Sequence, residues 1–187
     1  MKKVTLVPHK LDFCEDIYRM SSAPPVKEAL GLPDGTVEDT RQFVRQAMQQ
    51  EREGVTVPRV ILDGHGNLIG LTDLMFIDHS KKSCHIGTWI GHDYWGQGYN
   101  EASKIEILRI AFEELGLDYV FAGAREVNVR SQKAQAKLPF IRLGVEKEFP
   151  EEHHALEKKE KQPCVLNVFA KADFLQYLQK NGLRGSF

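Results

Sequence analysis

Apolar residues at helical spacing predict several helices along the chain. The clearest lies near residue 40, where Thr36 and Asp39 form a capping-box pattern ahead of an apolar stripe that includes Phe43 and Val44. The other helical segments are predicted at residues 13–20, 26–30, 105–115, 128–137 and 174–178.

The remaining hydrophobic runs are short, rich in β-formers and bounded by turn sequences, which is typical of strands. Strands are predicted at residues 3–7, 57–62, 68–77, 83–90, 119–124, 141–149 and 165–170. Turns at 63–67 and 78–82 favour antiparallel hairpins, and a long crossover between the fourth and fifth strands favours one parallel pairing. The charge-dense stretch 150–162 is predicted to be a solvated loop.

Together these patterns predict one mixed α/β (α+β) domain over residues 1–187. We expect a mostly antiparallel, mixed sheet of about six to seven strands with helices on both faces.

Composition narrows the classes of partner. The chain has 187 residues, 42% of them hydrophobic and 27% charged, and a formal net charge of −1. This balance gives no general attraction to nucleic acid or to an anionic membrane, so neither is expected as a partner. No run approaches the ~18 apolar residues of a membrane span. The apolar run from Val4 to Val7 is too short for the hydrophobic region of a signal sequence. The three cysteines are widely spaced, so we expect reduced thiols, a cytoplasmic protein and no metal site.

The stretch 84–103 carries the strongest chemical signal. It begins as a strand, passes through a loop containing Gly96 and Gly98, and continues into a patterned helix. Glycines let backbone amides approach a ligand closely, and a helix start offers unpaired N–H groups with a partial positive charge. The combination predicts a cradle for a phosphate-bearing cofactor.

Other phosphate motifs fit this loop less well. A dinucleotide fingerprint needs glycine or alanine where Glu101 stands. A P-loop needs lysine and a hydroxyl residue after its last glycine, and Tyr99-Asn100 follow Gly98 instead. From this motif alone, the alternative interpretation is a tight turn whose glycines only permit the bend and bind no ligand.

A second motif lies one strand further on, at residues 128–140, and reads Asn-Val-Arg-Ser-Gln-Lys-Ala-Gln-Ala-Lys-Leu-Pro-Phe. Together with the glycine loop, it resembles the GNAT superfamily of N-acetyltransferases, and most closely the branch that acetylates ribosomal-protein N-termini (RimJ/RimL-like). The matching positions in this sequence are Ile86, Gly87, Ile90, Trp95, Gly96, Gly98, Tyr99, Ala102, Asn128, Ser131, Ala134, Lys137 and Phe140. The resemblance covers nearly the whole chain and implies the GNAT fold.

The resemblance implies acetyl-CoA as the cofactor, used as a co-substrate without a metal. Its pyrophosphate would lie on the backbone amides of Gly96, Gln97, Gly98, Tyr99 and Asn100, behind Trp95. Its pantetheine arm would run beside Trp89, Ile90 and Gly91, with Asn128 as a further contact.

Three positions depart from the family pattern. Asn100 stands where glycine or alanine is usual, and an asparagine there can cap the helix. Gln135 replaces the tyrosine that protonates the departing thiolate in many members, so tyrosine-type acid catalysis is not expected at this position. His85 stands where the ribosomal-protein branch commonly carries glutamate.

The catalytic candidates are His85 and Ser131. Acetyl transfer needs a neutral amine, and a histidine of ordinary pKa about 6.5 is mostly neutral at pH 7, so His85 could act as the general base. Its alternative is a half-buried strand residue that points away from the cleft. Ser131 could donate a hydrogen bond to the departing thiolate, or it could simply help its helix begin.

The expected activity is therefore acetyl transfer to a primary amine by direct attack in a ternary complex. The acceptor is a protein or peptide N-terminus, or alternatively a polyamine or amine antibiotic, attracted by Glu15, Asp16, Glu151 and Glu152. A monomer or homodimer is expected. A non-catalytic acyl-CoA-binding module is the competing hypothesis.

Overall fold

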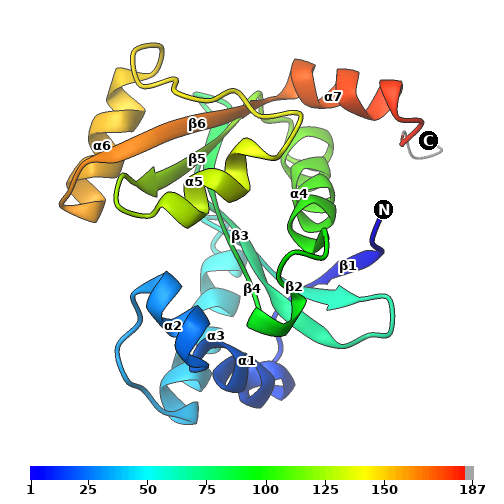
Figure 1. The fold of residues 1–187 in the computed structure, drawn as a ribbon, viewed down its shortest axis with the longest axis vertical. Helices are drawn as coiled ribbons and strands as arrows, with labels where there is room; N and C mark the ends of the chain where they lie inside the picture. Colours follow the sequence, from blue (N-terminus) through cyan, green and yellow to red (C-terminus); the bar gives the residue numbers. More distant parts are fainter. Residues whose placement is uncertain (184–187) are drawn as a thin grey trace. The chain divides into compact units, whose positions relative to one another are not determined.

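The computed structural model describes residues 1–183, and within them six strands form one sheet in the order β1-β2-β3-β4-β5-β6 (Figure 1). The strands are β1 (Val4–Val7), β2 (Val57–Asp63), β3 (Leu68–Asp78), β4 (Ser83–Ile90), β5 (Tyr119–Arg125) and β6 (Cys164–Ala170). The pairs β1–β2, β2–β3 and β5–β6 are antiparallel, whereas β4 and β5 pair in parallel. The predicted mixed, mostly antiparallel sheet is confirmed.

Residues 1–183 also form seven α-helices and three shorter helical segments, all of which lie between strands except α7, which follows β6. The α-helices are α1 (Cys14–Ser21), α2 (Pro24–Leu30), α3 (Val37–Arg52), α4 (Tyr99–Arg109), α5 (Val129–Ala136), α6 (Pro150–Glu160) and α7 (Lys171–Lys180). The short segments are η1 (Leu11–Phe13), η2 (His92–Tyr94) and the π-helical η3 (Ile110–Glu114).

Two predicted caps are confirmed. At the start of α3, the Thr36 side chain accepts from the Asp39 amide while the Asp39 carboxylate accepts from the Thr36 amide. At the start of α5, the side chain of Asn128 accepts a hydrogen bond from the Ser131 amide at 3.1 Å.

The chain divides into two compact units, each with its own core. Unit 1 comprises residues 1–77 and 87–110, and unit 2 comprises residues 78–86 and the chain from Ala111 onward. Strand β4 therefore begins in unit 2 and ends in unit 1.

In unit 1, neighbouring residues of β2 face different helices because side chains alternate along a strand. Val60 packs in a cluster with Cys14 of α1 and Val44 of α3. Its neighbour Ile61 packs in a separate cluster with Tyr99 of α4. These strands thus carry helices on both faces, as predicted.

Unit 2 is built around β5 and β6. Phe121, Leu166 and Val168 are buried together, with Phe149 and Leu156 packed against them. Helix α6 packs directly onto β5: a Cβ built at Gly123 would lie 2.4 Å from Cδ2 of Leu156.

Two predictions in this unit are wrong. The stretch 141–149 is not a strand, because it makes only one isolated bridge, Arg142 with Val168, before Gly144 turns the chain at φ 65°. The stretch 150–162 is not a solvated loop, because residues 150–160 form α6 with Pro150 in its first turn.

In the described part of the chain, no helix is long and apolar enough to cross a membrane. A search of residues 1–183 finds no group of three or more His, Cys, Asp or Glu side chains placed to hold a metal ion.

Candidate active site

The loop that follows β4 is fastened to the end of that strand. The indole Nε1 of Trp95 donates to the Ile90 carbonyl at 2.7 Å, and the ring lies edge-on to His92 with centroids 4.6 Å apart. The side-chain amide of Gln97 donates to the Asp93 carbonyl at 2.7 Å. These contacts fix the loop before α4 begins.

The two loop glycines have left-handed backbones that favour glycine. Gly96 has φ 71° and Gly98 has φ 85°. Gly98 is the N-cap of α4, and glycine has no side chain to occupy the amides of the first turn. Asn100 lies inside that turn, so the prediction that it caps the helix is wrong. The loop therefore presents backbone donors at a helix start, which suits an anion.

Lys2 adds a positive charge that the loop sequence does not reveal. Its ammonium lies 5.1 Å from the centroid of the buried Tyr99 ring, and its Cγ is 3.8 Å from a Cβ built at Gly98. The contact arises because β1 packs against α4. No spacing rule links residue 2 to residue 99, so this residue was missed.

The predicted pantetheine edge, Trp89 to Gly91, has some of its backbone groups in use. The Gly91 amide donates to the Ile69 carbonyl at 2.8 Å. The Trp89 carbonyl faces β3 so closely that a Cβ at Gly70 would lie 2.2 Å from it. The parallel pairing of β4 with β5 covers only Ser83 to His85. The Ile90 carbonyl is also in use, because it accepts from the indole of Trp95.

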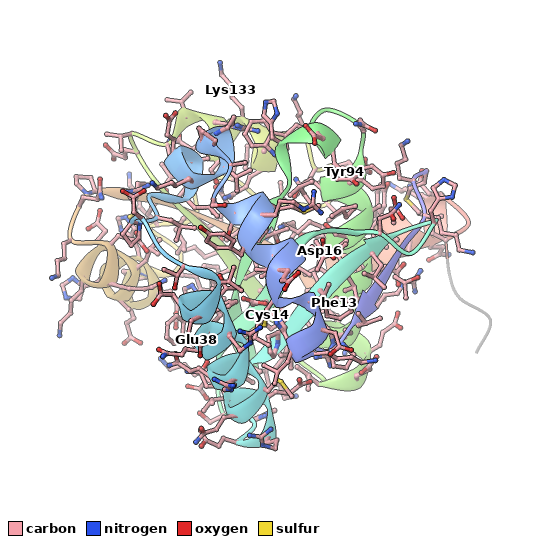
Figure 2. The ribbon with its side chains drawn as sticks, turned by 90° about the horizontal axis from the view of Figure 1, so that it is seen from below. Phe13, Cys14, Asp16, Glu38, Tyr94 and Lys133 are labelled. Carbon is pink, nitrogen blue, oxygen red and sulfur yellow. The ribbon has the colours of Figure 1, made fainter. Side chains whose placement is uncertain are left out.

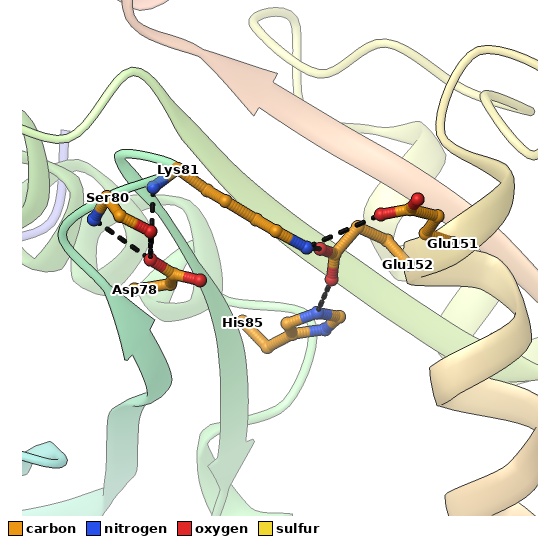
Figure 3. Close-up of polar contacts among 6 residues, drawn as sticks. All are labelled: Asp78, Ser80, Lys81, His85, Glu151 and Glu152. Carbon is orange, nitrogen blue, oxygen red and sulfur yellow. Dashed lines mark hydrogen bonds and ion pairs between the residues drawn. The ribbon is translucent and has the colours of Figure 1, made fainter.

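His85 lies in unit 2 and has a carboxylate partner (Figure 3). Its Nε2 is 2.8 Å from Oε2 of Glu152 on α6. The other carboxylate oxygen of Glu152 lies 3.8 Å from Nζ of Lys81, which also approaches Glu151 at 3.5 Å. The His85 side chain is 15% exposed and packs against Phe121 with centroids 5.3 Å apart. A histidine held by a carboxylate has a fixed ring orientation.

Ser131, the second catalytic candidate, belongs to a chain of hydrogen bonds at the start of α5. Its amide donates to Asn128, and its Oγ accepts from the side-chain amide of Gln135 at 3.3 Å. Gln135 is buried and accepts from Asn167 at 2.7 Å. A hydroxyl that accepts one hydrogen bond keeps its own O–H for donation.

In unit 1, a buried lysine of α4, Lys104, contacts the later part of β4. Nζ of Lys104 donates to Oγ1 of Thr88 at 2.5 Å, and the Thr88 hydroxyl is 2.7 Å from that of Thr72. Lys104 is 5% exposed, and burial lowers its pKa to about 7. The burial of Lys104 was not predicted from the sequence, because a lysine within a helical pattern is usually exposed to solvent.

The carboxylates predicted to attract a cationic acceptor have different surroundings. Asp16, on the exposed side of α1 (Figure 2), pairs with Arg19 at 2.8 Å. Glu151 and Glu152 flank Lys81 and His85. Glu152 thus acquires a partner that sequence analysis did not assign to it, 67 positions away along the chain.

The cysteine thiols are poorly suited to covalent catalysis. Cys14, Cys84 and Cys164 are buried and reduced. Burial raises the pKa of Cys84 to about 12, so its thiolate is scarce near neutral pH.

Comparison with known proteins agrees with the fold. The family of acetyltransferase (GNAT) domains matches residues 3–141. The candidate ribosomal N-acetyltransferase YdaF of Bacillus subtilis (strain 168) is 30% identical over 79 residues, which span 42% of this chain and 43% of the relative. The chain therefore aligns with less than half the length of this curated relative.

Two solved structures share the fold. The microcin C7 self-immunity acetyltransferase MccE, in complex with acetyl-CoA and AMP, is 16% identical with a TM-score of 0.67, covering 75% of this chain and 79% of that one. Spermidine N-acetyltransferase from Vibrio cholerae, in complex with CoA and spermine, is 13% identical with a TM-score of 0.69, covering 92% and 98%.

Since the family match spans well over half of the sequence, this chain belongs to the GNAT acetyltransferase family.

Proposed function

We propose that this protein transfers the acetyl group of acetyl-CoA to a primary amine by direct attack in a ternary complex. The observation that carries the proposal is the glycine loop at the start of α4, in a chain whose family is that of GNAT acetyltransferases. The loop provides backbone donors for the cofactor's pyrophosphate.

The donor would be held mainly by backbone groups. Amides from Gly96 to Asn100 would bind the pyrophosphate, and the Lys2 ammonium beside Tyr99 would add a favourable charge. The Gly91 amide already donates to Ile69 and the Ile90 carbonyl already accepts from Trp95, so the pantetheine arm would use the backbone groups that these bonds leave over. Oδ1 of Asn128 already accepts from the Ser131 amide, so Asn128 would contact the cofactor mainly through its side-chain NH2 group.

His85 would be the general base. Its imidazole, held at Nε2 by Glu152, would take a proton from the acceptor ammonium directly or through one water. The carboxylate compensates the charge of the imidazolium that forms. The neutral amine then attacks the thioester carbonyl carbon, the C–S bond breaks, and the proton that the new amide nitrogen loses is taken up by the departing thiolate.

Ser131 would stabilise the departing sulfur. Its Oγ accepts from Gln135, which leaves the hydroxyl hydrogen to be donated to the thiolate. Gln135 cannot replace the missing tyrosine as an acid, because a neutral amide does not release a proton in this pH range.

An α-amino terminus of a protein or peptide is the acceptor we favour. The alignment with YdaF supports this class. The chemistry agrees, because an α-amino group of pKa about 7.7–8.0 is roughly a tenth neutral at pH 7, whereas a lysine-like amine is well under a thousandth neutral. A polyamine is the alternative, supported by the fold shared with spermidine N-acetyltransferase.

The test is thiol release from acetyl-CoA with a panel of N-terminal peptides, polyamines and aminoglycosides. Turnover on any of these amines, with the acetyl group recovered on nitrogen, is the expected result. Binding of acetyl-CoA without turnover on any member would instead favour the non-catalytic acyl-CoA-binding module, for which the buried Gln135 at the tyrosine position is the motivating feature. Failure to bind acetyl-CoA would overturn both proposals.

A further inference from the structure

Unit 1 contains a cavity of about 270 Å³ that none of the proposed catalytic or cofactor residues line. It lies between α3 and the β2–β3 hairpin. Phe43 and Ala47 of α3 form one wall, and Pro58, Met75 and Phe76 of the hairpin strands form the other. The volume is below that of a drug-sized site, so it suits a small ligand.

Two buried side-chain oxygens in the cavity have no hydrogen-bond partner among the described residues. Oδ1 of Asp73 and Oγ1 of Thr56 are buried, and neither has a hydrogen-bond partner within residues 1–183. The carboxylate of Asp73 does accept from the backbone amide of Arg59. The Arg59 guanidinium, however, is 2.5 Å from Glu51. Asp73 is therefore an enclosed carboxylate with one acceptor oxygen still to be satisfied.

Burial has a measurable effect on this group. It raises the pKa of Asp73 to about 6, against the weaker lowering influence of Arg59. The carboxylate is still mostly ionised at neutral pH. Arg59 acts on this carboxylate but is itself paired with Glu51, so the buried negative charge is only partly compensated and its desolvation is costly.

The mouth of the cavity is aromatic. The side chains of Phe43 and Phe76 are 43% and 60% exposed. Phe76 also has φ 53°, in the left-handed region that bulky residues avoid. Strained backbones of this kind cluster at ligand sites. Aromatic faces attract cations, and a carboxylate in the lining of the same cavity can pair with one.

We propose that this cavity binds the primary ammonium group of a small aliphatic amine. The ammonium donates hydrogen bonds to Oδ1 of Asp73 and Oγ1 of Thr56, and its alkyl chain lies along Met75 and the two phenylalanines. An anion is excluded by the carboxylate. A neutral alcohol could donate one hydrogen bond but would leave the charge uncompensated.

This site goes beyond the proposed acetyl transfer. Its test is binding in the absence of acetyl-CoA, so it can fail while the transferase proposal stands, and the reverse also holds.

The experiment is thermal unfolding and calorimetric titration of the whole chain at pH 7.5 with n-butylamine, n-butanol and butyrate at matched ionic strength. The melting temperature is expected to rise with butylamine in the wild type and to be unchanged by butanol or butyrate. Asp73→Asn, whose side-chain oxygen can still accept from the Arg59 amide, is expected to lose at least tenfold in butylamine affinity. Asp12→Asn removes the same charge from an exposed position and should bind as the wild type does.

Thr56→Val is a second variant of nearly equal volume, and it is expected to weaken butylamine binding several-fold while keeping the fold. It carries the test if Asp73→Asn does not fold. The proposal is overturned if butylamine gives no shift, if butanol gives an equal shift, or if the folded Asp73 and Thr56 variants bind butylamine as tightly as Asp12→Asn.

Discussion

Two titratable side chains, His85 and Lys104, belong to or contact the same strand, but their surroundings compensate their positive charge to different extents. His85, in the unit 2 portion of β4, faces a carboxylate at 2.8 Å and is partly open to solvent. Lys104 meets Thr88 of the unit 1 portion of β4, and there its ammonium has hydroxyl groups as neighbours and almost no exposure.

The difference separates two uses of an ionisable side chain. A partnered, partly exposed imidazole can exchange protons with a substrate, because its charged form is compensated. An enclosed ammonium without a carboxylate is destabilised as a cation, so its protonation is linked to folding. The His85 cluster should therefore control turnover, and the Lys104 cluster should control the pH dependence of stability.

The largest expected effect is on turnover. His85→Ala should lower kcat by roughly 10²–10³-fold, since a general base contributes typically 10²–10⁴. Steady-state thiol release over pH 6–9 measures it. His79→Ala, in an exposed turn, is the control and should keep wild-type kcat. An unchanged pH–rate profile in His85→Ala would remove this residue from the mechanism.

Glu152→Gln tests whether this carboxylate orients the imidazole of His85. It should lower kcat by about tenfold by releasing the imidazole tautomer, whereas Glu151→Gln, at a side chain 85% exposed, should have little effect. Equal losses in the two variants would show that only the net charge near Lys81 matters.

The next effect is on stability. The pKa of Lys104 is lowered from 10.5 to about 7, so between these values the unfolded chain binds more protons and the native state gains stability as pH rises. Relative to Lys104→Met, the wild type should gain about 3–4 kcal/mol between pH 7 and pH 10. Urea unfolding at both pH values measures the difference, with Lys10→Met at an exposed site as control. A constant difference would mean that the ammonium is not desolvated.

Asp73 gives a smaller effect of opposite sign. Its folded pKa of about 6 lies above the ordinary 3.8, so the native state binds more protons between these values and loses stability as pH rises through them. Relative to Asp73→Asn, the wild type should lose about 2–3 kcal/mol between pH 4 and pH 7. The same unfolding experiment applies, and a difference that grows toward low pH would contradict the assignment.

The last expected effect, equal in size to that of Glu152→Gln, concerns Ser131. Ser131→Ala should lower kcat by about tenfold, equivalent to about 1.4 kcal/mol, with little change in KM for acetyl-CoA. Ser131→Thr keeps a hydroxyl and should recover part of the loss. If the alanine variant changes KM alone, Ser131 contributes to cofactor binding rather than to the departing thiolate.

Local rules predicted much of the fold. The capping residues Thr36 and Asn128 and the parallel β4–β5 pairing all follow from short-range pattern. Helix α6 was missed although its signals are present, with Pro150 and Glu151 in the first turn and lysines in the last. Its density of charge was interpreted as solvation, whereas one side of this helix is occupied by Leu156 against the core.

Within the candidate site, sequence pattern could predict the backbone of the glycine loop but not the contacts between side chains. Gly96 and Gly98 have the left-handed conformations that the loop motif implies. The partner of His85, the cation at Lys2 and the burial of Asp73 could not be predicted, because each depends on how distant elements pack rather than on local spacing.

Gly123 limits how this sequence can vary. Leu156 of α6, the helix that also carries Glu152, would have Cδ2 2.4 Å from a Cβ at position 123, so any side chain there forces the Leu156 side chain to move. We therefore expect the two positions to vary together, with a larger residue on β5 tolerated best alongside a smaller one at position 156. A mutation with no contact to substrate could in this way silence the enzyme, and a second mutation on α6 could restore it.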